Sequence, residues 1–118
     1  MRQFRAEFHK TKIIDAIFID VDNKSISKIK VQNNENYLQK FLDFYKYVVM
    51  DVPGSDDCLF VSCDYDSRTK KPFLMKGEPK YRFNGNAVIL RLPKSNNYQK
   101  LMKTHMTVEE VEKLITFI

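Results

Sequence analysis

The chain has 118 residues, of which 43% are hydrophobic and 30% are charged, with 20 Lys and Arg against 15 Asp and Glu. The hydrophobic share is too high for a disordered chain, two cysteines cannot build a disulfide scaffold, and no apolar run approaches the ~20 residues of a membrane-spanning helix. These figures predict one small globular domain over residues 1–118, with no membrane contact. Because no apolar stretch near Met1 is typical of a secretory signal, we expect a cytoplasmic protein with reduced cysteines.

The first elements are predicted to be a strand hairpin followed by a helix. Residues 13–20 are a short, β-branched apolar run, typical of a strand that is covered on both faces. A polar turn at 21–24 leads to a second strand over 25–31, whose Lys28 and Lys30 suit an exposed sheet edge. The spacing of apolar residues then predicts a helix over 34–46.

The rest of the chain is predicted to be mostly strands, with one helix at the end. Strands are expected over residues 47–52, 59–64 and 87–92, with a shorter extended segment at 73–75. Residues 77–80 indicate a loop, and the Asn84–Gly85 pair is typical of a hairpin turn. Thr107 and Glu110 have the spacing of a capping box, which predicts a final helix over 107–117.

This order predicts an α+β fold. We expect a mostly antiparallel sheet of about five strands, with one helix after the second strand and a C-terminal helix. Residues 1–10 precede the first strand and are expected to form an N-terminal arm.

No metal or cofactor site is predicted. Two carboxylate pairs have the spacing i, i+2: Asp20 with Asp22, and Asp64 with Asp66. Lys24 and Arg68 stand where a calcium loop requires an oxygen ligand, so a turn is the better interpretation of both pairs. The two cysteines and the two histidines, His9 and His105, match no zinc spacing.

No catalytic residue is predicted either. Cys63 falls on the apolar side of its strand and is interpreted as a buried thiol. Cys58 stands beside Asp56 and Asp57, which would raise the pKa of its thiol rather than activate it. With three glycines in the chain, a phosphate-cradling loop is effectively excluded. An enzyme acting on a small molecule stays open only if the fold holds a deep polar pocket.

The strongest functional feature is charge, since residues 65–106 carry ten basic and two acidic side chains. We expect these cations to form one contiguous positive surface, which would attract an acidic protein or a phosphate backbone. A solvated face that only keeps the protein soluble is the third interpretation. The candidate partner-binding residues are Arg68, Lys70, Lys71, Lys76, Lys80, Arg82, Lys94, Lys100 and Lys103, with Tyr65, Phe73 and Tyr98 as aromatic anchors.

The order of several short segments also resembles a known family. The segments are 17–20, 26–31, the aromatic helix, 48–53, 58–61 and 84–89. Over residues 13–92 they resemble a family of small uncharacterised domains found on phages and conjugative elements. That family has no agreed activity and no catalytic residues, so the resemblance implies only a mobile-element setting.

In that setting, the expected function is that of a small non-enzymatic accessory protein of a phage or mobile element. It would bind and modulate a host protein or nucleoprotein complex in the host cytoplasm, for example as an inhibitor of a bacterial defence system. The alternative is a nucleic-acid-binding module that uses the basic 65–103 region.

Overall fold

The computed structural model describes residues 12–42, 47–62, 71–77, 81–95, 97–98 and 100–118. The expected N-terminal arm therefore lies outside the described residues. In chain order the elements are β1 (Ile13–Asp20), β2 (Ser25–Gln32), α1 (Glu35–Leu42), β3 (Tyr47–Asp51), β4 (Cys58–Ser62), β5 (Pro72–Met75), β6 (Tyr81–Asn84), β7 (Ala87–Leu90), α2 (Val108–Glu112) and β8 (Ile115–Phe117).

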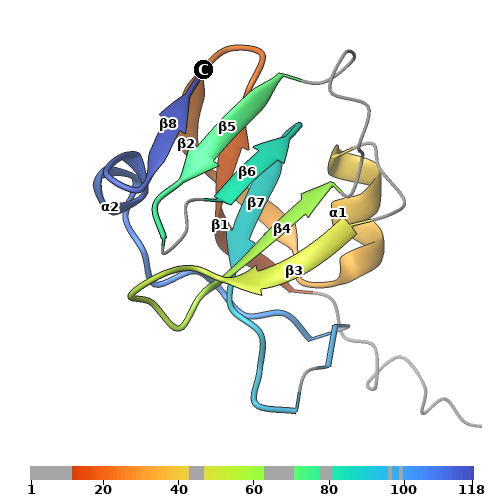
Figure 1. Cartoon of the computed structure of the whole chain (residues 1–118). Coiled ribbons are helices and arrows are strands. Elements are labelled where there is room, and N and C mark those ends of the chain that lie inside the picture. Colours follow the sequence, from red (N-terminus) through yellow and green to blue (C-terminus); the bar gives the residue numbers. More distant parts are fainter. Residues whose placement is uncertain (1–11, 43–46, 63–70, 78–80, 96, 99) are drawn as a thin grey trace, which may run out of the picture.

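The strands form two antiparallel sheets, shown in Figure 1. Sheet A has five strands in the order β2-β1-β7-β4-β3, and sheet B has three in the order β6-β5-β8. The α+β prediction is confirmed, with one helix after the second strand and one near the C-terminus. The second sheet was not expected.

The β1–β2 hairpin is confirmed. Its turn is stabilised by the Asp20 carboxylate, which accepts the backbone N–H groups of Asp22 at 3.1 Å and Asn23 at 3.2 Å. Lys24 closes the turn with φ 50°. Asp20 thus serves a turn, as the sequence predicted, and β2 is left as the outermost strand of sheet A.

Strand β1 is covered on both faces, also as predicted. Ile17 and Ile19 are fully buried in a core cluster that sheet B and α2 complete with Phe73, Met75 and Val111. Ala16 points to the other face, where it joins a second cluster with Val31 and Leu38 of α1. Alternate residues of one strand therefore serve two cores.

The predicted helix over 107–117 is wrong in its second half. The capping box of Thr107 and Glu110 is present, but α2 ends at Glu112. Ile115 and Phe117 instead lie in β8, opposite Met75 and Phe73 of β5. Pairing with β5 and burial on its inner face outweigh the helical spacing of these apolar residues.

The hairpin expected at Asn84–Gly85 is also wrong. Strand β6, which the sequence did not predict, pairs with β5, whereas β7 pairs with β1 and β4. Gly85, with φ 104°, lets the chain turn from sheet B into sheet A. The Oδ1 of Asn86 then accepts the Val21 N–H at 2.9 Å, which ties this turn to the end of β1.

The remaining predicted elements differ from the structure mainly at their ends. Helix α1 covers residues 35–42 of the predicted 34–46, and 43–46 lie outside the described residues. Asn34 caps it, because its Oδ1 accepts the Tyr37 N–H at 2.9 Å. The three strands predicted at 47–52, 59–64 and 87–92 are found as β3, β4 and β7.

Candidate functional site

The chemistry-bearing side chains meet where β4 begins and β7 ends. Before β4, the chain turns at Pro53 and Gly54, where the Ser55 N–H donates to the Val52 carbonyl at 3.1 Å and Gly54 has φ 74°. Proline followed by a left-handed glycine is typical of a type II turn. The Ser55 hydroxyl then accepts the Asp57 N–H at 3.0 Å, and Asp57 directly precedes β4.

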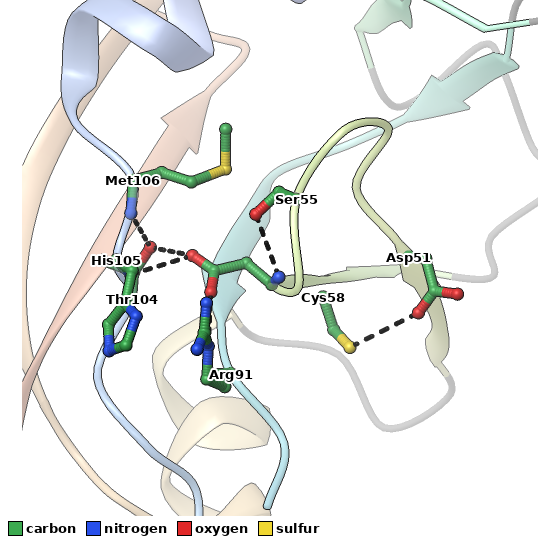
Figure 2. Close-up of polar contacts among 8 residues, drawn as sticks. Asp51, Ser55, Cys58, Arg91, Thr104, His105 and Met106 are labelled. Atoms are coloured by element: carbon green, nitrogen blue, oxygen red, sulfur yellow. Dashed lines mark hydrogen bonds and ion pairs between the residues drawn. The ribbon is translucent and has the colours of Figure 1, made fainter.

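The Asp57 carboxylate is fully buried and is bound by three donors. It accepts the Arg91 Nε–H at 3.0 Å, the His105 backbone N–H at 3.1 Å and the Thr104 hydroxyl, as Figure 2 shows. We call these four residues the Asp57 clamp. Because a buried charge is tolerated only when it is paired and hydrogen-bonded, this set accounts for the burial of Asp57. The clamp ties β4, β7 and the segment before α2 together.

The clamp is poorly suited to acid–base or nucleophilic chemistry. Both carboxylate oxygens of Asp57 already accept hydrogen bonds, and the residue has no exposed surface. The imidazole of His105 is exposed and points away from Ser55 in Figure 2, so these two side chains do not form a base–nucleophile pair. Within the described residues, the contacts of the clamp stabilise the fold.

The Cys58 thiol is not activated. Burial raises its pKa, and the negative charge of Asp51 raises it further. The thiol donates to the Asp51 Oδ1 at 3.9 Å, since Asp51 lies opposite Cys58 in the β3–β4 ladder. The sequence predicted a raised pKa from Asp56 and Asp57; the direction is confirmed, but the leading neighbour is Asp51. Cys63 lies outside the described residues.

Residues 101–104 extend sheet A where β1 and β7 separate. Met102 exchanges two backbone hydrogen bonds with Arg91, at 3.0 and 2.8 Å, and the Thr104 N–H donates to the Asp15 carbonyl at 3.0 Å. Leu101 is buried, whereas Met102 is 43% exposed and Lys103 is exposed. The Asp57 clamp therefore holds in place a segment that presents Met102 and Lys103 to solvent.

A second carboxylate on the same face of sheet A lies among lysines. Asp15 pairs with Lys30 in the β1–β2 register, and its carboxylate is 2.6 Å from the Lys30 ammonium and 3.8 Å from that of Lys28. The hydrogen bond from Lys30 lowers the pKa of Asp15, partial burial opposes this, and the charges of Lys30, Lys28 and Lys103 lower it further. We call these four residues the Asp15 cluster.

The described cations of the predicted binding region come from two parts of the fold, sheet B with its connections and the segment after β7. Lys71, Lys76 and Arg82 belong to sheet B or its connections, and all are exposed. The segment after β7 carries exposed Lys94, Lys100 and Lys103, of which Lys103 lies near Asp15 of β1. Four predicted binding residues lie outside the described residues: Tyr65, Arg68, Lys70 and Lys80.

The aromatic anchors are largely used by the core. Phe73 is fully buried and packs against Phe83 with ring centroids 5.4 Å apart, so its prediction as a partner-binding residue is wrong for this conformation. Its position on the inner face of β5 is the reason. Tyr98 is half-buried, edge-on to Phe60 at 6.1 Å, and its carbonyl accepts the Glu35 N–H at 3.0 Å.

Sequence reasoning missed Asp57 and the Asp15 cluster as organised sites. Lys28 and Lys30 were recognised as edge residues, and their spacing was the available signal for a shared face. The sequence around Asp57 indicated only a turn. Its partners Arg91 and Thr104 are 34 and 47 residues away, so no local pattern pointed to them.

The described part of the chain contains neither a metal-ligand cluster nor a helix suited to a bilayer. No group of three or more His, Cys, Asp and Glu side chains there is placed to hold a metal ion. No helix in that part is long and apolar enough to cross a bilayer.

The described residues form a small two-sheet α+β structure with exposed basic side chains. No protein-family model, curated protein or solved structure matches this chain.

Proposed function

We propose that this chain is a small non-enzymatic accessory protein that binds an acidic protein or nucleoprotein partner and modulates it. One observation carries the proposal. Lys71, Lys76, Arg82, Lys94 and Lys100 are exposed, and none forms an ion pair with another described residue. Exposed, uncompensated charge produces a field in solvent that speeds and orients association with an anionic surface.

The non-enzymatic part rests on how the reactive side chains are used. Asp57 is buried and bound by three donors, and the Cys58 thiol is protonated more firmly than an ordinary thiol. A general base or a nucleophile needs access to a substrate and a pKa suited to proton transfer. Asp57 lacks this access, and the raised pKa of Cys58 leaves its thiol protonated.

An acidic protein is favoured over single-stranded nucleic acid as the first contact. Stacking on unpaired bases requires exposed aromatic rings. Of the three proposed anchors, Phe73 is buried and Tyr98 packs against Phe60. Lysines without stacking partners still attract phosphate, so the nucleic-acid alternative is retained as an outcome of the test.

The setting is proposed on the resemblance alone. Residues 13–92 resemble small domains of phages and conjugative elements, which points to a host protein or nucleoprotein, such as a defence complex, in the host cytoplasm. The proteins of a bacterial lysate are therefore the partners to test first.

The test is affinity capture with two matched charge reversals. One variant carries Lys94→Glu and Lys100→Glu, the other Lys76→Glu and Arg82→Glu, and both are checked for an unchanged thermal transition. Tagged proteins are incubated with bacterial lysate, with and without nuclease, and the captured proteins are identified by mass spectrometry. We expect a protein that is retained after nuclease treatment and lost with at least one variant.

Two results would overturn the proposal. If both variants capture the same proteins as the unmodified chain, these cations do not form the binding surface. If nuclease abolishes every capture, and oligonucleotide affinity falls steeply as salt concentration rises, the nucleic-acid alternative is correct.

A further inference from the structure

Among the described strands, β2 forms one edge of sheet A. It pairs with β1 over all eight of its residues, and no other described strand pairs with it. In an antiparallel pair, alternate residues direct their N–H and C=O groups away from the partner strand. The outer edge of β2 therefore offers a row of backbone donors and acceptors to another extended segment.

The two faces of this edge differ in chemistry. Lys28 and Lys30 lie opposite Ile17 and Asp15, and their side chains are 60% and 72% exposed. Between them, Ile29 faces the other side and packs beside the cluster under α1 while remaining partly exposed. Residues two apart on a strand are separated by about 7 Å, so a second strand with the same alternation would match this pattern.

The charge along β2 determines which kind of extended segment can bind at this edge. Asp15 balances only part of the positive charge of Lys28, Lys30 and Lys103, the three lysines that act on it. Lysines on an edge repel ordinary strands, and opposite charges in facing positions stabilise a strand pair. Carboxylates are therefore favoured opposite Lys28 and Lys30. Helix α2 also contacts β2 and carries exposed Glu109 and Glu112, which disfavour acidic groups near that helix.

We propose that β2 binds an extended segment of a partner protein by strand addition, with carboxylates opposite Lys28 and Lys30 and apolar side chains on the Ile29 side. The inference rests on the proposed function for the existence of a protein partner, and it names that partner's chemistry. Because Asp15 holds the two lysine ammonium groups in the free protein, the incoming carboxylates must compete with it.

The experiment uses the full chain and a capped eight-residue peptide in which Glu and Val alternate. The control peptide has the same composition with the four Glu and four Val residues in two blocks. Binding is followed by NMR titration, and amide hydrogen exchange is compared with and without peptide. We expect the alternating peptide to bind and to slow exchange at alternate amides of β2, and the block peptide to bind more weakly.

Three variants make the test specific. Lys28→Glu with Lys30→Glu should weaken the alternating peptide by roughly tenfold or more. Asp15→Asn should strengthen it, since the lysines lose their internal competitor. Lys71→Glu with Arg82→Glu changes the net charge equally on the β5–β6 side of sheet B, which does not pair with β2, and should leave the affinity within about twofold. If the variant with Lys28→Glu and Lys30→Glu does not fold, a variant with Lys28→Gln and Lys30→Gln is tested in its place.

The proposal is overturned if the peptide does not bind, if binding is insensitive to Lys28 and Lys30, or if the β2 amides gain no protection. These outcomes are independent of the lysate captures, because the peptide is a purified probe. A partner captured through Lys94 and Lys100 by a chain that ignores the peptide would support the proposed function and reject strand addition.

Discussion

Asp57 and Asp15 lie on the same face of sheet A, yet their surroundings give them different roles. The side chain of Asp57 has no exposed surface and pairs with Arg91, which is 21% exposed. The side chain of Asp15 is 27% exposed and pairs with Lys28 and Lys30, whose side chains lie mostly in solvent. One carboxylate is enclosed by fixed donors, and the other shares flexible cations with water.

This difference predicts that Asp57 contributes more to the stability of the fold than Asp15 does. When a buried ion pair loses one partner, the remaining charge is left unpaired in the protein interior, where it is poorly solvated. The charges of an exposed pair can be solvated by water and screened by salt ions instead. We therefore expect Asp57 to stabilise the fold, and the proposed recognition role falls to the lysines around Asp15. The following predictions test this division.

The largest effect is expected from Asp57→Ala. The substitution leaves the Arg91 guanidinium and the Thr104 and His105 donors without their acceptor, and should lower the free energy of unfolding by about 3–5 kcal/mol. Urea denaturation measures the change. Asp56→Ala is the matched control, because Asp56 is exposed one residue earlier and should change stability by less than about 0.5 kcal/mol. Equal effects of the two substitutions would contradict the role given to Asp57.

A smaller loss is expected from Thr104→Val, which preserves shape and removes only the hydroxyl. Asp57 then loses one of its three donors and the Met106 N–H loses its acceptor, so stability should fall by about 1–3 kcal/mol. Thr116→Val is the control on exposed β8 surface. If Asp57→Ala is already present, Thr104→Val should cost much less, and a double-mutant cycle measures this coupling.

The sequence predicted those parts of the fold that neighbouring residues determine. The β1–β2 turn and the Thr107–Glu110 capping box depend on side chains within a few residues of one another. Strand β8 could not be found this way, because Ile115 and Phe117 fit a helix as well as a strand. Only the presence of β5, some forty residues earlier, decides between them.

The candidate sites also divide into residues that local sequence patterns could place and residues that depend on long-range contacts. Lys28 and Lys30 could be placed on one exposed face, since alternation in a strand is a local property. The pairing of Asp57 with Arg91 depends on β4 and β7 being neighbours, a contact across 34 residues. Phe73 was misjudged for a related reason, because its burial depends on the unforeseen packing of sheet B over sheet A.

Tyr47 and Glu35 form an intermediate case, half-buried on the opposite face of sheet A. The Tyr47 hydroxyl donates to the Glu35 carboxylate and so ties β3 to α1. Tyr47→Phe should therefore lower stability by about 1 kcal/mol at neutral pH, measured by urea denaturation. Burial, and then the Glu35 carboxylate, raises the pKa of Tyr47.

This raised pKa gives the Tyr47 substitution a signature in alkali. The folded state keeps the phenol proton after the unfolded chain has begun to lose it, above pH ~10, so the contribution of Tyr47 to stability is complete below that value and declines above it. The advantage of the unmodified chain over Tyr47→Phe should shrink as pH rises beyond ~10. A constant difference would show that the phenol proton is not coupled to folding.

The smallest effect on stability is expected from Asp15→Asn, and its size depends on pH and salt. Because its lysine neighbours lower the pKa of Asp15, its contribution is present above the ordinary carboxyl pKa of ~3.9 and is lost as pH falls below it. The variant should be slightly less stable than the unmodified chain at neutral pH and low salt, and equally stable in acid or at high salt. Thermal unfolding from pH ~7 to ~2, with Asp22→Asn as control, measures this difference. A large loss that persists in salt would place Asp15 with Asp57 as a fold-stabilising carboxylate, and its lysines would then no longer be free to receive a partner's carboxylates.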